Sequence, residues 1–346
     1  MGQIFDLIRL FGLVRLAKMK RRHDKALPFI RGYCTTVSLW ALFNTGVCDE
    51  LKRGAATAGE LAAKLGLDER ILGILLDYLD CVRVVRRGAD GRWALDALGR
   101  DLAEEPRGAF DLACGYEEVM TDLTGLLRGE KKFGRDVRRR MRFIAKGSGE
   151  LGVQLPFPVM ADMVRRAGFH VVLDLGSGDL EFLFTLCRGD ASLRGYGIDI
   201  SEEAVAHARE RLAGSPFRDR IVVEQGDMFD AGAFLARWKD VDAMSACDAF
   251  HEHLFEGTGK IDGLLARCRR EFPGVALLVA EFCRQPHERL RKRPTAFVEH
   301  HLWHHLTNQV ILSADEWRDI FRRAGYRVAE ERVFDVVGHG YFLLRA

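Results

Sequence analysis

The second half of the chain alternates between short apolar runs and longer stretches in which apolar residues recur every three or four positions. The runs predict buried strands, and the longer stretches predict helices. The predicted strands are residues 171–173, the run ending at Asp199, the run starting at Ile221, and residues 241–246, 275–282, 326–333 and 341–345. Strands separated by helices predict an α/β fold with a parallel sheet, and the last two strands predict a reversed hairpin that completes it.

The first half of the chain has helical periodicity for most of its length. We expect an amphipathic helix over 4–18, a long helix over 26–56 interrupted at 44–46, helices starting at Thr57 and Asp68, and a hairpin over 82–95. Thr57 and Glu60 have the spacing of a capping box, and Gly66 is placed to end the helix that they start. Helix, turn, helix and hairpin in this order predict a winged helix.

A winged helix either reads DNA or serves as a structural module for dimerisation. The expected recognition helix, residues 68–80, carries four carboxylates and one arginine. Such a surface repels phosphate, so we expect no nucleic-acid partner. The apolar stripe over 4–18 fits a membrane surface or a second copy of the chain. Helix stripes most often face protein, so we expect a homodimer and no membrane partner.

A boundary between two domains is expected near residue 150. Residues 107–150 look helical and include a basic run over 131–142, which we interpret as a solvated face. A Gly-Ser-Gly sequence at 147–149 then interrupts the pattern, and residues 151–168 predict a helix that leads into the sheet. We therefore expect a helical domain over 1–150 and a sheet domain over 151–346.

Composition adds few constraints. A chain of 346 residues has room for two domains, and 48% apolar and 29% charged residues are ordinary for a globular protein. The net charge of +2 predicts no strongly charged partner. The eight cysteines form no C-x-x-C pair, which favours free thiols in a reducing cytoplasm. Charged residues interrupt residues 1–22, so we expect no secretory signal there, and no apolar run approaches the length of a membrane span.

The first strand of the sheet domain leads directly into a glycine turn. Asp174 ends the strand, and Gly176 and Gly178 let the backbone approach a ligand where a Cβ would clash. A strand, a glycine turn and a helix in this order are how a parallel sheet holds a nucleotide-like ligand at its carboxyl edge. An ordinary strand-to-helix turn is the alternative for this stretch taken alone.

The ends of the next two strands strengthen the interpretation as a nucleoside site. Asp199 ends the second strand, where an acid can accept hydrogen bonds from both hydroxyls of a ribose. Asp227 and Met228 follow the third strand, where a carboxylate and a thioether suit the amino group and the ring face of adenine. The carboxyl ends of neighbouring parallel strands lie at one edge of the sheet, so these side chains are expected to form one site.

These motifs resemble those of the class I S-adenosylmethionine-dependent methyltransferases, over residues 151–346. That family has D-x-G-x-G at the end of the first strand and an acid after the second strand, and this chain has both. The sequence G-D-M-F, which follows the third strand here, also fits the family. The resemblance implies S-adenosyl-L-methionine as the cofactor and six residues that bind it: Asp174, Gly176, Gly178, Asp199, Asp227 and Met228. The chain departs from the family at Leu180, where a third glycine is usual. A dinucleotide-binding dehydrogenase is the alternative, but its pattern would need glycine in place of Glu181.

The layout is similar to that of the small-molecule O-methyltransferases of natural-product biosynthesis. The resemblance implies a Rossmann-like seven-stranded methyltransferase sheet with an N-terminal, mostly α-helical winged-helix dimerisation domain. In those enzymes H-D-W follows the fourth strand, and its histidine is the general base; here the sequence at 251–253 is H-E-H. His251 is then the implied base, and Glu281 the acid that orients it. The family's lysine is Cys247 here, and its second orienting acid has no clear match near Ile311.

A second histidine cluster lies at 300–305. Helical spacing puts His300 above His304 and His301 above His305, so one pair can face inward. With His251, an inward pair offers imidazoles to iron or another divalent metal. The α-keto acid C-methyltransferases, a branch of the same family, resemble this arrangement, which implies His251 and His304 as metal ligands. The metal would act as a Lewis acid on a chelated keto acid and stabilise the enolate that takes the methyl group.

Residues 299–309 also look like the 2-ketoarginine methyltransferase subgroup, which implies a carboxylate for a guanidinium: Asp248, Glu252 or Glu281. C-methylation of an α-keto acid is our leading expectation. The alternative is O-methylation of a hydroxylated natural product with His251 as general base, and a cofactor-binding regulator or an inactive relative is a third. His253 is expected at the rim of the site. The other histidines are interpreted as surface or structural: His23, His170, His207, His287 and His339.

Overall fold

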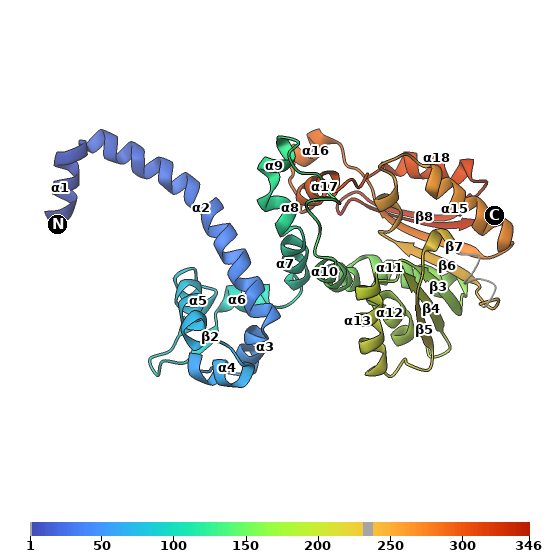
Figure 1. Ribbon diagram of the computed structural model, residues 1–346, viewed down its shortest axis with the longest axis horizontal. Coiled ribbons are helices and arrows are strands. Elements are labelled where there is room, and N and C mark those ends of the chain that lie inside the picture. Colours follow the sequence, from blue (N-terminus) through green and yellow to red (C-terminus); the bar gives the residue numbers. More distant parts are fainter. Residues whose placement is uncertain (1, 231–237) are drawn as a thin grey trace. The chain divides into compact units, whose positions relative to one another are not determined.

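The computed structural model describes residues 2–230 and 238–346 (Figure 1). The chain divides into two compact units, Met1–Phe110 and Asp111–Ala346. Within the described ranges, no helix combines the length and the apolar composition that a bilayer crossing needs.

The first unit is helical with one small hairpin. Its elements are α1 (Gly2–Phe11), α2 (Leu13–Asn44), α3 (Val47–Arg53), α4 (Ala58–Leu65), α5 (Glu69–Cys81), β1 (Val85–Arg87), β2 (Trp93–Leu95) and α6 (Ala97–Leu102). The helix expected over 4–18 is divided at Gly12, whose φ of +75° is not helical. The helix expected from residue 26 begins earlier instead, because α2 continues through Pro28.

Local capping signals in this unit behave as the sequence predicts. Thr57 and Glu60 form the expected capping box, and Gly66 ends α4 with a left-handed φ of +67°. The Asp68 carboxylate accepts a hydrogen bond from the backbone N–H of Ile71 at the start of α5. The helices and the antiparallel β1–β2 hairpin follow in the order expected of a winged helix. A role in dimerisation stays a prediction.

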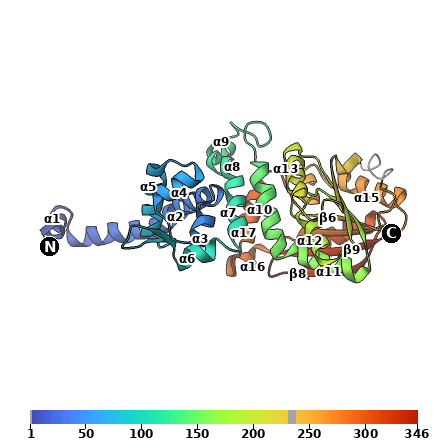
Figure 2. The same ribbon diagram turned by 90° about the horizontal axis from the view of Figure 1, so that it is seen from below.

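The second unit begins with helices that precede the sheet. They are α7 (Arg107–Gly115), which starts just before the division, α8 (Glu117–Thr121), α9 (Leu123–Leu127), α10 (Met141–Gln154) and α11 (Pro156–Ala167). The boundary expected at 150 falls inside α10, whereas the two units divide at Phe110. The glycines at 147–149 are therefore part of a helix. Helix α10 packs against α11 and against α12 (Glu181–Gly189) (Figure 2).

Close packing explains why glycines occupy this helix. A Cβ on Gly149 would lie 2.9 Å from Oδ1 of Asp179, and a Cβ on Gly152 would lie 2.3 Å from the ring of Phe157. Glycine is the residue that lets a helix approach a neighbour this closely. The same residues therefore look like a linker in the sequence and form a packing face in the structure.

Seven strands form one sheet, which confirms the predicted fold class. They are β3 (Val171–Leu175), β4 (Arg194–Asp199), β5 (Ile221–Gln225), β6 (Ala243–Cys247), β7 (Ala276–Phe282), β8 (Arg327–Phe334) and β9 (His339–Arg345), in the spatial order β5-β4-β3-β6-β7-β9-β8. The first five are parallel, and β9 lies antiparallel between β7 and β8.

Helices cover both faces of the sheet (Figure 1). Apolar residues of α15 (Gly259–Glu271) and α18 (Ala314–Arg323) pack on one face, and those of α11, α12 and α13 (Glu202–Ala213) pack on the other. The connections that follow β3 to β7 all leave from the carboxyl edge. Because β9 is antiparallel, it begins at that same edge, where His339 pairs with Phe282 at the end of β7. This edge therefore gathers residues that are far apart in the sequence.

Candidate active site

A first cavity, of about 160 Å³, lies at the carboxyl edge of β3, β4 and β5. Four of the six predicted cofactor residues line it: Gly176, Asp199, Asp227 and Met228. His253, expected at the rim of the site, lines it as well. We call it the donor cavity, because these are the positions that the sequence assigns to the methyl donor.

The glycine turn and Asp199 form one hydrogen-bonded unit. The backbone N–H of Gly178 donates to Oδ2 of Asp199 at 2.9 Å, and the N–H of Ser201 donates to Oδ1 at 2.8 Å. Burial raises the pKa of Asp199 above its usual range, and these two N–H groups act in the opposite direction. Gly178 does not line the donor cavity; it fixes the carboxylate that does.

Asp174 and Asp227 have different surroundings. Asp174 is buried, lines neither of the cavities described here, and accepts a hydrogen bond of 2.7 Å from the Ser245 hydroxyl. Burial raises its pKa to about 7. Asp227 is exposed, and its Oδ1 accepts from the N–H of Phe229 at 2.9 Å. Asp227 thus lines the donor cavity and Asp174 does not, so a direct contact between Asp174 and the cofactor stays a prediction.

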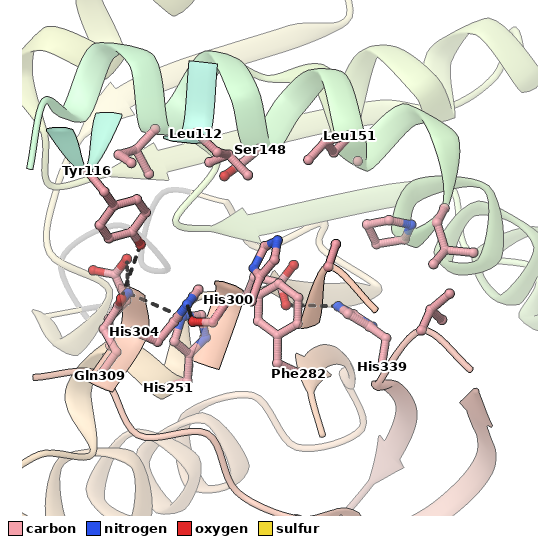
Figure 3. A pocket seen from close by; sticks show the side chains of 18 of the residues that line it. Leu112, Tyr116, Ser148, Leu151, His251, Phe282, His300, His304, Gln309 and His339 are labelled. Atoms are coloured by element: carbon pink, nitrogen blue, oxygen red, sulfur yellow. Dashed lines mark hydrogen bonds and ion pairs between the residues drawn. The ribbon is translucent and has the colours of Figure 1, made fainter. Parts of the chain in front are cut away.

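A second cavity, of about 340 Å³, adjoins the first, and Asp248 and Glu252 line both. We call it the acceptor cavity. Figure 3 shows Tyr116 and Gln309 at one side of it and His339 at the other, with His251 and His304 between them. Its polar lining includes four imidazoles, two carboxylates and one guanidinium: His251, His300, His304, His339, Asp248, Glu252 and Arg139.

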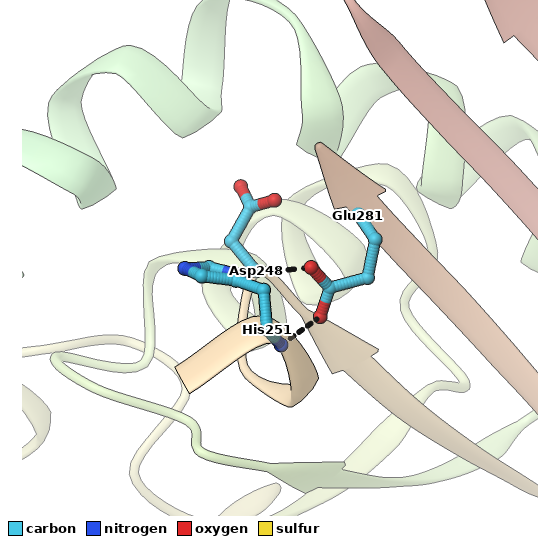
Figure 4. A group of neighbouring side chains, drawn as sticks. All are labelled: Asp248, His251 and Glu281. Atoms are coloured by element: carbon cyan, nitrogen blue, oxygen red, sulfur yellow. Dashed lines mark hydrogen bonds and ion pairs between the residues drawn. The ribbon is translucent and has the colours of Figure 1, made fainter. Parts of the chain in front are cut away.

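His251 is held in one orientation on both sides of its ring. It lies in the 3-10 turn η2 (Phe250–His253), and its Nδ1 is 2.8 Å from Oε2 of Glu281 (Figure 4). The N–H of Phe250 donates to the other oxygen of Glu281 at 2.6 Å. Nε2 of His251 is 3.3 Å from Nε2 of Gln309. An amide nitrogen can only donate, so we assign the His251 proton to Nδ1 and a lone pair to Nε2.

The charge state of His251 depends on Glu281. Burial by itself would lower the pKa of His251, but the buried Glu281 carboxylate outweighs this effect, and the pKa is raised. Glu281 is fully buried and lines neither cavity. It is therefore a positioning residue for His251 and does not itself face a ligand.

The inward pair on the histidine helix is His300 and His304. Both are on α17 (Phe297–Leu306) and line the acceptor cavity, whereas His301 lines a separate groove and His305 is exposed. Nδ1 of His304 is 2.6 Å from the carbonyl oxygen of His300, so it carries the proton and leaves Nε2 as the nitrogen that can act as a ligand. Burial lowers the pKa of His304 to about 2. The His251 and His304 ring centroids are 4.9 Å apart.

Arg139 and Glu252 form a bidentate ion pair beside His251. Nη1 and Nη2 of Arg139 donate to the two carboxylate oxygens at 3.0 and 2.9 Å. Burial would raise the pKa of Glu252, but Arg139 outweighs it and the pKa is lowered. The amide of Gln309 donates a further hydrogen bond to Oε1 of Glu252 at 3.0 Å. Glu252 is therefore ionised and accepts three hydrogen bonds from neighbouring side chains.

Several lining residues were not predicted from the sequence. Tyr116 and Arg139 lie outside the motifs, and Arg139 is part of the run interpreted as a solvated face. Gln309 ends the stretch 299–309, but the sequence assigns its side chain no role. His339 was interpreted as surface or structural, but it is buried and its Nε2 is 2.9 Å from Oδ1 of Asp248. The antiparallel register of β9 brings His339 to the site, and no local motif reveals that register.

With this fold, the comparisons with known proteins identify the chain as an S-adenosylmethionine-dependent methyltransferase that acts on a small molecule. Residues 170–325, a little under half of the chain, match the family model described as a methyltransferase domain. Over 323 residues it is 28% identical to the 2-ketoarginine methyltransferase of Streptomyces arginensis, with 90% of each chain covered. It is 25% identical over 202 residues to the O-methyltransferase SfmM3 of Streptomyces lavendulae, with 54% of this chain and 60% of that protein covered.

Solved structures share the fold at lower sequence identity. Human N-acetylserotonin methyltransferase, in complex with S-adenosylmethionine, matches with a TM-score of 0.68 and 16% identity, over 95% of this chain and 97% of that one. The mitomycin 7-O-methyltransferase MmcR matches with a TM-score of 0.67 and 19% identity, over 95% and 99%. Likeness at this level establishes the fold and leaves the acceptor to be argued from the site.

Proposed function

We propose that this methyltransferase methylates the carbon next to the keto group of an α-keto acid, with a divalent metal held by His251 and His304. The observation that carries the proposal is the matched protonation of these two buried rings. Glu281 holds the proton on Nδ1 of His251, and the His300 carbonyl holds the proton on Nδ1 of His304. Both rings then keep Nε2 unprotonated, although a metal at His251 would displace the Gln309 amide that donates to this nitrogen. Hydrogen bonding of the second ring nitrogen is the usual support for a metal-ligating histidine.

The donor set fits a divalent metal. The low pKa of His304, about 2, keeps this ring neutral at every working pH, as a ligand must be. A bound metal would supply Lewis-acid stabilisation for the negative charge that develops on the keto oxygen when the neighbouring carbon loses its proton. Asp248, His251 and Glu281 also bring possible ligand atoms within 4.8 Å of one another. We assign the metal to the imidazoles, because Glu281 is committed to His251 and Asp248 is paired with His339.

Arg139 supports an acceptor that carries a carboxylate. Among the described residues it is the one Lys or Arg that lines the acceptor cavity. Its two terminal nitrogens bond Glu252, while its Nε is buried and has no acceptor in the described part of the chain. A guanidinium binds a carboxylate well along the edge formed by Nε and one terminal nitrogen. The full-length similarity to a 2-ketoarginine methyltransferase agrees with an α-keto acid as the acceptor class.

O-methylation of a hydroxylated natural product is the second candidate. It is favoured by the His251–Glu281 pair, which is the arrangement of a general base and the acid that orients it. In this case Nε2 of His251 would take the proton of the acceptor hydroxyl, and His304 would have no ligand role. Similarity to the O-methyltransferase SfmM3 agrees with this alternative.

Metal content separates the two candidates. We expect the purified full-length protein to contain iron or another divalent metal by elemental analysis. Release of S-adenosylhomocysteine with α-keto acids should stop after treatment with a chelator and recover when the metal is restored. His304→Ala should lose both metal and turnover. His305→Ala changes an exposed ring on the same helix and should keep both. A metal-free enzyme whose turnover ignores the chelator would reject the keto-acid proposal and favour the general base.

We also propose that the chain forms a homodimer in the cytoplasm. In the single chain, α1 and the first turns of α2 expose a set of large apolar side chains: Ile4, Phe5, Leu7, Leu10, Phe11, Leu13 and Val14. An apolar surface of this kind is usually covered by a partner. The eight free cysteines support a reducing compartment. Light scattering after gel filtration tests the dimer: the mass of two chains is expected, and substitution of Phe5 and Leu10 by Asp should give the mass of one.

A further inference from the structure

Leu180 stands in the glycine turn at the position where the family usually has a third glycine. Its φ is +70°, a left-handed conformation that glycine adopts freely. For a leucine the same conformation is unfavourable, because the Cβ crowds a backbone carbonyl oxygen. A residue persists in such a conformation only when the surrounding structure holds it there. Contacts from outside the turn therefore have to fix Leu180.

We infer that Arg211, in the last turn of α13, is a positioning residue for the methyl donor. It bonds the residues on both sides of Leu180, and it thereby holds the glycine turn in the shape from which the Gly178 N–H anchors Asp199. The inference concerns donor binding alone, so it does not depend on which acceptor the enzyme methylates.

The guanidinium of Arg211 bonds the residue before Leu180 and the residue after it. Its Nη1 donates to the backbone carbonyl oxygen of Asp179 at 3.0 Å and also to Oδ2 of the same residue. Its Nη2 donates to Oε2 of Glu181. The other carboxylate oxygen of Asp179 accepts from the backbone N–H of Glu181 at 3.2 Å. Leu180 thus lies between two residues that are bonded to each other and to one arginine.

Burial makes these bonds strong and confines Leu180 from its other side. The side chains of Asp179 and Glu181 are each 11% exposed, and the side chain of Arg211 is 30% exposed. The Leu180 side chain is fully buried and lies close to Gly197 of β4, where an added Cβ would be 2.7 Å from Cδ2 of the leucine. Packing therefore fixes the side chain of Leu180, and Arg211 fixes the backbone on either side of it.

Helix α13 reaches Asp199 from both of its ends. At its start, the backbone N–H of Ser201 donates to Oδ1 of Asp199 at 2.8 Å. At its end, Arg211 holds the turn whose Gly178 N–H donates to Oδ2 of Asp199 at 2.9 Å. Asp199 lines the donor cavity, whereas Arg211 and the two acids that it bonds line neither cavity. Arg211 therefore acts on the donor only through the turn.

Calorimetric titration of the full-length protein with S-adenosylmethionine tests the inference. Arg211→Gln leaves the buried Asp179 carboxylate beside Glu181 without the arginine that they share, which should open the turn. We expect the Kd of S-adenosylmethionine to rise roughly 10-fold, the effect of losing a hydrogen bond to a charged group. Arg209→Gln changes an exposed arginine of the same helix and should leave the Kd unchanged. An unchanged Kd in Arg211→Gln would overturn the inference.

Hydrogen exchange measured by mass spectrometry separates a positioning role from general support of the fold. In Arg211→Gln, we expect the peptide that covers the glycine turn to exchange faster than in the wild type. The peptide that covers α18, on the opposite face of the sheet, should exchange as before. Equal acceleration of the two peptides would show that Arg211 only stabilises the fold, and it would overturn the inference.

Two further variants test the link to Leu180 and provide for a failure of Arg211→Gln to fold. Glycine at position 180 adopts the left-handed φ without strain, so in a Leu180→Gly background Arg211→Gln should raise the Kd only about 2-fold. An undiminished loss in that background would overturn the role assigned to Leu180. Arg211→Lys keeps the charge, but a single ammonium group lacks the fork that bonds both acids, so the Kd should rise several-fold. An unchanged Kd in a folded Arg211→Lys variant would likewise overturn the inference.

Discussion

Nδ1 of His251 lies 2.8 Å from Oε2 of Glu281, and both side chains are almost completely withdrawn from solvent. The pair links the turn after β6 to the end of β7, and the Phe250 N–H reinforces it by donating to the other oxygen of Glu281. One buried carboxylate thus sets the tautomer, the orientation and the pKa of the ring that faces the acceptor cavity. Both candidate mechanisms need this, because a metal ligand and a general base each require the Nε2 lone pair.

Glu281→Gln should lower kcat by about 10- to 100-fold, the usual effect of removing a hydrogen-bonding partner behind an active imidazole. Burial lowers the pKa of His251 and Glu281 raises it, so loss of the carboxylate should also move the pKa of this ring down. The measurements are steady-state kinetics and the pH dependence of kcat. Glu281 lines neither cavity, so the Kd of S-adenosylmethionine should stay the same. A variant that weakens donor binding as much as turnover would show that Glu281 only supports the fold.

Asp199→Asn should weaken S-adenosylmethionine binding by roughly 10- to 100-fold. Both carboxylate oxygens accept a hydrogen bond from a backbone N–H, one from Gly178 and one from Ser201. In the variant, the amide NH2 would replace one of these oxygens and would lie opposite a backbone N–H that it cannot accept from. The glycine turn would then lose its anchor, and the ribose would lose a charged acceptor. Calorimetry with the donor measures the effect. Asp219→Asn, at a side chain that is 88% exposed, is the matched control and should bind normally.

Much of the fold and half of the site could be predicted because the signals are local. The run from Asp174 to Gly178, the acid at 199 and Asp227 mark strand ends, and strand ends of a parallel sheet meet at one edge. The helical spacing of 300–305 reduced four histidines to two possible inward pairs. The sequence could not choose between the pairs, because the choice depends on how α17 packs.

The remainder of the site depends on long-range register and packing. His339 reaches Asp248 because β9 runs antiparallel to β7 and starts where β7 ends. Arg139 lies within a run of basic residues that looks solvated, yet its side chain is only 10% exposed because it pairs with Glu252. Neither relationship leaves a periodic or motif-like trace near the residue concerned.

Gly152→Ala should destabilise the protein by about 1–3 kcal/mol, the usual cost of overpacking, even though alanine favours helix. The new methyl group would lie 2.3 Å from the Phe157 ring, which itself packs near Phe182. Gly73→Ala in α5 is the matched control. A Cβ there meets nothing within 4 Å, so helix propensity should raise stability by up to about 1 kcal/mol. Chemical denaturation measures both changes, and equal effects at the two positions would contradict the packing explanation.

Asp174→Asn should stabilise the protein at neutral pH and flatten part of its pH dependence. Burial raises the pKa of Asp174 from the ordinary 3.8 to about 7. Between these values the folded chain keeps a proton that the unfolded chain has released. The free energy of unfolding therefore falls as the pH rises from about 4 to about 7, by about 1.4 kcal/mol per pH unit from this group, and stays level above that window.

The asparagine variant removes this contribution and can still accept the hydrogen bond from the Ser245 hydroxyl. The difference in unfolding free energy between variant and wild type should thus grow from pH 4 to pH 7 and then remain constant at a few kcal/mol. Ser245→Ala provides a second test, because it should raise the pKa of Asp174 further instead of removing the titrating group. The Ser245 hydroxyl lowers the pKa of Asp174, so its removal should move the upper end of the window to higher pH. Urea denaturation at a series of pH values measures all three proteins, and a difference that does not depend on pH would show that Asp174 is already ionised in the folded chain.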